Sequence, residues 1–179
     1  MPPLITVRPE GLYCAAGDFY IDPWKPVETA LITHAHADHA YSGHSHYYAT
    51  AISEGILRRR LGQEINLSGV QCGDRIKIND TWISFHSAGH VLGSAQIRIE
   101  HKGEVWCISG DYKRDADPSC DPFEVVECDS FITEATFGLP IYRWDSGELT
   151  AEQIHSWWEG DLTRPSLLFC YSFGKSQRV

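Results

Sequence analysis

The sequence predicts a mixed α/β fold in which two β-sheets pack face to face and helices lie outside them. Three observations predict it. Short apolar or alternating segments separated by turn residues fill the first fifty positions, and a helical segment follows them. Residues 65–106 carry strand-like patterns throughout, and a strand–helix–strand order comes after them. With 179 residues, of which 42% are hydrophobic, the chain can bury one sizeable core.

Five short strands and one helix are expected in the first part of the chain. The strands lie, in chain order, at residues 4–7, 11–15, 19–22, 29–33 and 46–49, and the second and third form a hairpin. Thr50 can cap a helix over residues 51–61, because its side-chain oxygen can accept a hydrogen bond from the first turn. Three arginines at 58–60 fall near the C-terminal end of this helix, where positive charge complements the helix dipole. We interpret them as a solvated helix end rather than a basic patch.

The later residues predict six further strands and a second helix. The strands are expected at residues 75–78, 82–86, 95–100, 105–108, 130–133 and 166–173, and the last two are apolar enough to be core strands. Asn79 and Asp80 form the turn between the first two. Thr150 can cap the second helix, which runs through Trp158. A short helix is also expected to begin after residue 173, and its N-terminus could hold a phosphate.

The composition bounds the class of protein. The chain has 15 basic and 24 acidic residues, a formal charge of −9, which does not favour non-specific nucleic-acid binding unless bound dications supply local positive charge. The six cysteines are scattered without a C-x-x-C pair, and no secretory leader is recognised, so we expect a reduced, cytoplasmic protein. The longest apolar runs are too short to cross a bilayer, and no membrane partner is expected.

The chain is organised around residues 33–40, Thr-His-Ala-His-Ala-Asp-His-Ala, which place four metal-capable side chains within six positions. A buried strand precedes them, so they lie on the loop at its end. His34 and His36 can point the same way only on an extended or tightly turned backbone, and Asp38 and His39 then face a neighbouring point. This arrangement suits two adjacent ions better than one. Nitrogen and oxygen ligands without thiolate fit catalytic zinc or a manganese-like ion.

Four further candidates follow other predicted strands. His90 lies between glycines that let the backbone approach a ligand closely. Asp111, Asp22 and Glu134 also come directly after apolar strands. Although a lone aspartate at a strand end is commonly a turn residue, acidic or histidine residues at one end of five strands form a constellation typical of an active site.

Three basic residues are candidates for contacts with substrate phosphate. Lys113 and Arg114 follow Asp111 directly, and a solvated turn explains each of them equally well. Lys175 stands in the sequence Gly-Lys-Ser, which lacks the glycine five residues earlier that a phosphate-binding P-loop requires. The remaining histidines lack ligand-like spacing and are expected to be core or surface residues: His44, His46, His86, His101 and His155.

The metal-capable residues resemble the motifs of the metallo-β-lactamase superfamily. Residues 33–39 match its H-x-H-x-D-H signature, His90 and Asp111 match its next two metal motifs, and Asp22 matches its early acidic motif. Two stretches, 88–96 and 134–138, resemble the nucleic-acid-processing branch that carries the β-CASP insertion. Further stretches are most similar to the bacterial ligase-associated DNA exonuclease family: residues 110–114, 133–140 with 142–144, and 169–178.

The resemblance implies an αββα sandwich that binds two zinc ions, or manganese in their place. His34, His36 and His90 would hold the first ion. Asp38, His39 and Asp111 would hold the second, with Asp111 bridging both. Asp22 and Glu134 would orient the ligand histidines from behind.

The resemblance also implies a reaction. Two ions about 3.5–4 Å apart activate a hydroxide that attacks phosphorus in line, and Asp38, Asp111 and Glu134 are the expected catalytic residues. The substrate would be DNA rather than RNA, in repair alongside an ATP-dependent DNA ligase and a helicase. Three alternatives stay open: an RNA-processing nuclease of the same branch, a small-ester hydrolase, and a catalytically silent metal-binding subunit.

The family pattern continues past Val179 with a histidine that helps proton transfer and a last histidine ligand. We therefore expect residues 1–179 to be the N-terminal portion of a longer protein, without its β-CASP-like and C-terminal parts, and the sandwich to be incomplete at its C-terminus. In this form the first ion should bind more tightly than the second, and hydrolysis should be weak or absent.

Overall fold

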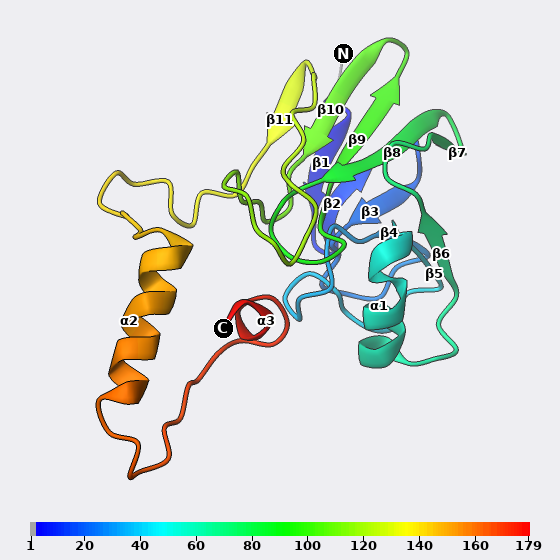
Figure 1. Cartoon of the computed structure of the whole chain (residues 1–179). Coiled ribbons are helices and arrows are strands. Elements are labelled where there is room, and N and C mark those ends of the chain that lie inside the picture. Colours follow the sequence, from blue (N-terminus) through cyan, green and yellow to red (C-terminus); the bar gives the residue numbers. More distant parts are fainter. Residues whose placement is uncertain (1–2) are drawn as a thin grey trace. The chain divides into compact units, whose positions relative to one another are not determined.

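The computed structural model describes residues 3–179, and two sheets fill its first unit, which ends at Glu134 (Figure 1). The first sheet has six strands in sequence order: β1 (Ile5–Arg8), β2 (Gly11–Cys14), β3 (Phe19–Ile21), β4 (Thr29–Leu31), β5 (His46–Thr50) and β6 (Leu67–Val70). Strands β1 to β3 pair antiparallel, and β3 to β6 pair parallel. The predicted hairpin and buried strand are confirmed.

The second sheet has five strands in the order β11-β10-β9-β8-β7. Their bounds are β7 (Ile76–Ile78), β8 (Thr81–Ser87), β9 (Ala95–His101), β10 (Glu104–Ile108) and β11 (Ser130–Ile132). Strands β7 to β10 form an antiparallel meander, and β11 lies parallel to β10. Because β8, β10 and β11 run in the same direction, the residues that follow them leave the sheet at one edge.

One core joins the two sheets. Phe19, Ile21 and Leu31 from the first sheet are almost completely buried against Phe85 and Ile97 from the second. Along β8 and β9, apolar side chains alternate with polar ones over residues 83–86 and 95–100, so the second sheet turns a hydrophobic face toward the first. The face-to-face sandwich that the sequence predicts is therefore confirmed.

The predicted first helix divides into two parts. A 3₁₀ turn, η1 (Ala51–Ser53), leads into α1 (Glu54–Leu61), which lies beside strands β4 to β6 in Figure 1. Thr50 caps the turn as expected, because its Oγ1 accepts a hydrogen bond from the backbone N–H of Ser53 at 3.3 Å. Leu57 is the fully buried residue of α1 and fixes its inner face.

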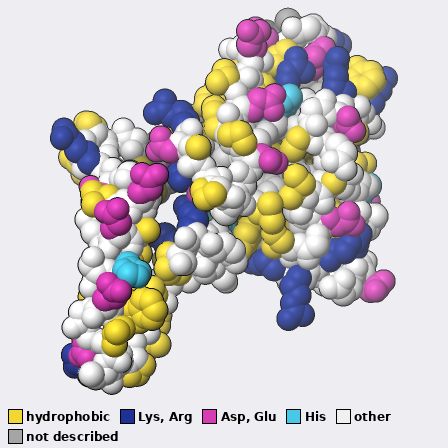
Figure 2. Space-filling model, in the orientation of Figure 1, with side chains coloured by type: hydrophobic (Ala, Val, Ile, Leu, Met, Phe, Trp, Pro, Cys, Tyr) yellow, Lys and Arg dark blue, Asp and Glu magenta, His cyan; other side chains and the backbone are white. Residues whose placement is uncertain are grey.

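The second unit, Ala135–Val179, contains α2 (Gly147–Glu159) and the single-turn α3 (Lys175–Arg178). The predicted cap of α2 is wrong by one turn. Ser146 caps the helix by accepting a hydrogen bond from the Leu149 N–H at 3.1 Å, and Thr150 lies inside it. Figure 2 shows hydrophobic side chains gathered over the C-terminal end of α2, where Trp157 and Trp158 are about half exposed.

Two predicted core strands are corrected. Residues 166–173 form no strand, because no strand among residues 3–179 pairs with them, and Phe169 is 95% exposed. The segment at 130–133 does form a strand, and Ile132 packs against the core, but β11 is the edge of its sheet and Phe131 is exposed. Apolar content alone does not decide burial; a strand also needs a neighbour on each side. None of the helices at residues 3–179 is long and apolar enough to span a bilayer.

Candidate metal centre

The loop after β4 is fixed by hydrogen bonds to neighbouring residues, and these bonds need no metal ion. The backbone N–H of Thr33 donates to Asp22 Oδ1 at 2.8 Å, and its hydroxyl donates to Asp22 Oδ2 at 2.6 Å. On the other side, the Ala95 N–H donates to the Thr33 carbonyl at 2.8 Å, which ties the loop to the start of β9 in the second sheet. Asp22 follows β3 in the first sheet, so residues 33–40 begin at the junction of both sheets.

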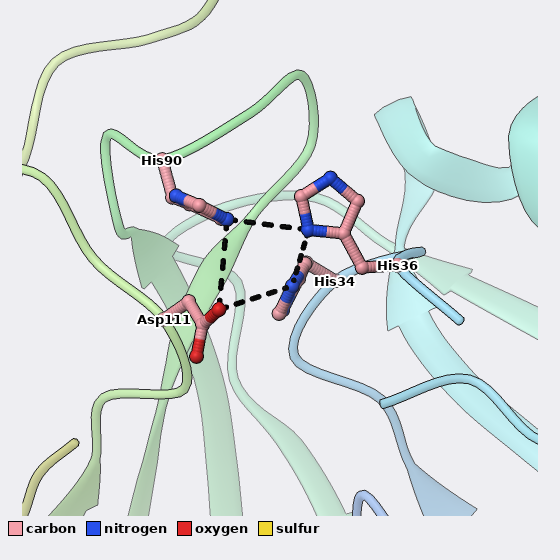
Figure 3. A group of neighbouring side chains, drawn as sticks. All are labelled: His34, His36, His90 and Asp111. Atoms are coloured by element: carbon pink, nitrogen blue, oxygen red, sulfur yellow. Dashed lines mark hydrogen bonds and ion pairs between the residues drawn. The ribbon is translucent and has the colours of Figure 1, made fainter. Parts of the chain in front are cut away.

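Four side chains from three loops converge next to this junction (Figure 3). One ligand atom from each of His34, His36, His90 and Asp111 lies within 4.8 Å of all the others. His36 Nδ1 is 3.0 Å from His34 Nε2 and 3.3 Å from His90 Nε2. Asp111 Oδ2 is 3.7 Å from His90 Nε2 and 3.9 Å from His34 Nε2. The site brings together exactly the side-chain atoms that can donate lone pairs to one ion.

These distances are close to those between the ligand atoms of one bound ion. Zinc–nitrogen bonds of about 2.0–2.1 Å in tetrahedral geometry place neighbouring ligand atoms about 3.3 Å apart. Four of the six separations between the ligand atoms lie between 3.0 and 3.9 Å, and all six lie within 4.8 Å, so the group is slightly wider than a closed tetrahedral site. Three imidazoles and a carboxylate also match the ligand set of catalytic rather than structural zinc sites.

A second group lies on the other side of Asp111. His39 Nε2 is 3.3 Å from Asp111 Oδ1, and Asp38 Oδ2 is 4.0 Å from the same nitrogen. The Asp38 side chain is 76% exposed, whereas that of His39 is 20% exposed. The two oxygens of Asp111 therefore face different histidine groups, Oδ2 toward His34 and His90 and Oδ1 toward His39.

Asp22 fixes which ring nitrogens carry hydrogen. His39 Nδ1 is 2.8 Å from Asp22 Oδ2 and donates to it, so an ion would bind at Nε2, on the side of Asp111. The Thr33 hydroxyl already donates to Asp22, so it accepts a hydrogen bond from His34 Nδ1 at 3.1 Å. The lone pair of His34 Nε2 then points into the four-residue group. One carboxylate orients histidines on both sides of the site.

Without an ion, the charges of this centre are strongly coupled. Burial and the neighbouring charges of His39 and His90 lower the pKa of His34 to about 2. Burial also opposes the charge on His39, but hydrogen bonds to Asp111 and Asp22 outweigh it and raise the pKa of His39 to about 10. The hydrogen bond from His39 lowers the pKa of Asp111 to about 2. The metal-free site thus keeps one proton on His39 that an ion would have to displace.

We expect the stability of the metal-free protein to fall as the pH rises above about 6.5. His39 is more basic in the folded than in the unfolded chain, so its contribution is complete below pH 6.5 and is lost toward pH 10. The limiting slope for one such proton is about 1.4 kcal/mol per pH unit. Urea unfolding of chelator-treated protein between pH 6.5 and about 7.5, where ordinary thiols with a pKa of about 8.5 are still protonated, measures it.

The matched variant for this measurement is His39→Gln, which keeps a hydrogen-bonding side chain but has no proton to lose. Its stability should be nearly independent of pH over the same interval. An equal slope in the variant and the parent would contradict the assignment to His39.

Glycines allow the loops of the site to touch. Gly89, next to His90, has φ +67°, and a Cβ added there would lie 2.3 Å from the Lys113 carbonyl oxygen. Gly110, next to Asp111, has φ +54°, and an added Cβ would lie 2.6 Å from Thr33 Cβ. Both positions combine a left-handed backbone with a contact that leaves no room for a side chain.

The other predicted site residues have different surroundings. Glu134 is half-buried directly after β11, at the end of the first unit. Lys113 donates to the buried Asp117 carboxylate at 3.1 Å, so its ammonium serves the fold. Arg114 is exposed, with no side-chain hydrogen bond or ion pair among the described residues. Lys175 begins α3 in the second unit, where its Nζ lies 5.7 Å from the centre of the Tyr171 ring.

The five remaining histidines stay outside the ligand group, as predicted. His46 contacts Ser68, His86 contacts Glu124, His101 contacts the Asp80 carbonyl, and His155 pairs with Glu159. His44 is buried, and its Nδ1 accepts a hydrogen bond from the Val27 N–H at 3.3 Å. These contacts are structural.

Sequence reasoning missed two contributors. Thr33 links Asp22 to His34, and the only signal for this is a hydroxyl residue directly before the first histidine. The arginine triplet lies in the last turn of α1, and Arg59 and Arg60 are exposed, as predicted, but two of the three also make contacts that the pattern did not reveal: Arg58 binds Glu54 and two backbone carbonyls, and Arg60 donates to the carbonyl of Ala35. Pattern alone cannot show that a helix end lies next to a loop twenty-five residues earlier.

The chain is similar in sequence to several curated proteins, although no family model matches it. It is 29% identical over 174 residues to a protein named "Probable DNA ligase" from Opitutus terrae, which covers 94% of this chain and 17% of that protein. It is 26% identical over 171 residues to "Endoribonuclease YSH1" from Mycosarcoma maydis, covering 74% of this chain and 19% of the relative. It is 24% identical over 140 residues to "RNase J-like protein" from Methanocaldococcus jannaschii, and this similarity covers 65% of this chain and 33% of the relative. The chain spans a third or less of the length of each of these relatives.

Proposed function

The chain belongs to the metallo-β-lactamase superfamily, in its nucleic-acid-processing β-CASP branch, and from this premise we propose that it carries the metal centre of a DNA exonuclease. Two of the three relatives carry ribonuclease names, which supports a hydrolase that acts on nucleic acid. The proposal adds two zinc ions, or manganese in their place, and DNA as the substrate. The observation that carries it is the Asp111 carboxylate, whose two oxygens face two separate histidine groups.

Each side chain then has a definite task. His34, His36 and His90 would hold the first ion, and Asp38, His39 and Asp111 the second. When bound, the ions supply charge neutralisation at the phosphoryl oxygens and a nucleophile at neutral pH. Asp22 keeps the hydrogens of His39 Nδ1 and, through Thr33, of His34 Nδ1 away from the ions. Glu134 is a further candidate for orienting a ligand.

Substrate contacts follow from exposure and charge. The Arg114 guanidinium is three residues beyond Asp111, exposed, and able to bind a phosphate with two parallel hydrogen bonds. Lys113 is a weaker candidate because its ammonium already pairs with buried Asp117. Lys175 lies in the second unit and is a candidate on the sequence alone. A DNA ligase and a helicase are proposed as functional partners, since the resembling family acts with both.

The choice of DNA over RNA rests on how much of the chain each comparison covers. The similarity to the protein named as a DNA ligase extends over 94% of this chain, whereas those to the two proteins with ribonuclease names cover 74% and 65%. The stretches at 110–114 and 169–178 support the same choice. An RNA-processing nuclease is the second candidate, because two of these three relatives carry such names.

A panel of end-labelled substrates tests the proposal. We expect single- or double-stranded DNA to be shortened faster than RNA of the same sequence, with activity lost on chelation and restored by zinc or manganese. Excess protein over substrate makes slow turnover visible, and elemental analysis gives the ion content of the same sample. Faster loss of RNA would establish the second candidate. Bound metal without turnover on nucleic acid or thioester substrates would instead identify a binding subunit.

A further inference from the structure

We propose that Arg60 is a positioning residue of the metal centre, because its guanidinium holds the backbone between two ligand histidines. The inference rests on the proposed function insofar as His34 and His36 bind an ion. Arg60 lies in the last turn of α1, and its Nη1 donates a hydrogen bond to the carbonyl oxygen of Ala35. Ala35 is the residue between the two histidines and is completely buried.

The surrounding backbone shows why this contact matters. The Thr33 carbonyl receives a hydrogen bond from Ala95, and the His36 carbonyl receives them from His39 at 3.3 Å and Ala40 at 2.9 Å. Those donors are backbone groups of a strand and of the local turn. The Ala35 carbonyl depends on a side chain from a separate helix. A buried carbonyl that loses its donor rotates toward another one, since backbone polar groups are rarely left unpaired inside a protein.

Rotation of this peptide would change the ligand geometry directly. The Ala35 carbonyl belongs to the peptide that leads into His36, and His36 Nδ1 lies 3.0 Å from His34 Nε2 and 3.3 Å from His90 Nε2. His34 is further fixed by Thr33, whereas His36 is on the side of the loop that Arg60 holds. Arg60 is therefore expected to set the position of His36 against the other ligands.

Its neighbours provide the contrast. Arg58 donates hydrogen bonds to the Glu54 carboxylate at 2.9 Å and to the backbone carbonyls of Gln63 and Ile65 at 2.8 and 3.0 Å. Arg59 is exposed and has no hydrogen bond or ion pair within residues 3–179. Successive helical side chains point about 100° apart, so adjacent arginines of equal charge face different surroundings. Arg59 is thus a matched control for charge, and Arg60 alone reaches the metal loop.

The test compares Arg60→Ala, Arg60→Lys and Arg59→Ala in the 179-residue chain. The affinity for Zn²⁺ alone is measured by competition with a chromophoric chelator. Arg60→Ala should weaken the tighter site by about 10- to 100-fold, the usual effect of removing a group that orients a ligand. Arg60→Lys keeps one donor and should lose less, and Arg59→Ala should bind like the parent. Circular dichroism establishes that each variant is folded.

Hydrogen–deuterium exchange of residues 33–40 in the metal-free protein gives a second readout that needs no ion. It should be faster in Arg60→Ala than in Arg59→Ala, and Arg60→Lys decides the matter if the alanine variant does not fold. Unchanged zinc affinity and exchange in Arg60→Ala, or equal losses in Arg59→Ala, would overturn the inference. If the parent chain binds no zinc, the proposed function fails, and the exchange comparison alone decides the role of Arg60.

Discussion

Replacing Asp111 with alanine should abolish hydrolysis and leave the sandwich folded. The carboxylate lies 3.3 Å from His39 and 3.7 and 3.9 Å from His90 and His34, so its loss removes a ligand from both proposed ions. We expect the rate to fall by about 1,000-fold or more, the effect of removing a principal electrostatic stabiliser. Zinc stoichiometry and the rate of DNA shortening, measured on the same preparation, check this.

Asp115→Ala is the matched control for that variant, because Asp115 is an exposed aspartate four residues further along. It should keep both the ion content and the rate. Asp111→Ala also removes the hydrogen-bond partner of His39, so its unfolding midpoint should fall at neutral pH while the chain stays folded. Full nuclease rate in Asp111→Ala would rule out the two-ion arrangement.

Gly89→Ala should cause the largest loss of stability among single-atom additions near the site. The new Cβ would lie 2.3 Å from the Lys113 carbonyl and 2.9 Å from the Phe123 nitrogen, and both are backbone atoms that cannot turn aside. We expect the free energy of unfolding to fall by about 3 kcal/mol, because the site becomes overpacked and alanine is strained in a left-handed backbone conformation. Urea unfolding of the metal-free protein gives this value.

Gly103→Ala separates the two causes. Gly103 has φ +85°, similar to Gly89, but an added Cβ meets nothing within 4 Å. Gly103→Ala should lower the free energy of unfolding only by the backbone strain, about 1 kcal/mol. Because His90 follows Gly89, the clash should also weaken zinc binding in Gly89→Ala and leave it intact in Gly103→Ala. Equal destabilisation of the two variants would show that the close contact is unimportant.

The sequence predicts the strands of the two sheets better than the structure of the second unit. Alternation and turn residues predict the meander from β7 to β10 well, because each strand pairs with its sequence neighbour. Residues 166–173 have the same apolar character and form no strand, since pairing depends on a partner that composition cannot reveal. The cap of α2 is misplaced because Ser146 and Thr150 are both suitable residues one turn apart.

The candidate site divides in the same way. Close spacing in sequence marks His34, His36, Asp38 and His39 as a group. Placing Asp111 between them and His90 requires the directions of β4, β8 and β10, which a single sequence suggests only through the apolar strands before each residue. The contacts of Thr33 and Arg60 come from packing between elements distant in sequence, and no local pattern carries them.

Asp111 gives the site a property that neither histidine group has alone. Its two oxygens belong to one rigid planar group on a short side chain. A rotation that brings Oδ2 closer to His34 and His90 therefore also moves Oδ1 relative to His39. Coupling between two binding equilibria is reciprocal: whatever one occupied site does to the affinity of its neighbour, the neighbour does in return. If two ions bind as proposed, a substitution that alters this carboxylate from either side would change both affinities, and the two positions could not be tuned independently.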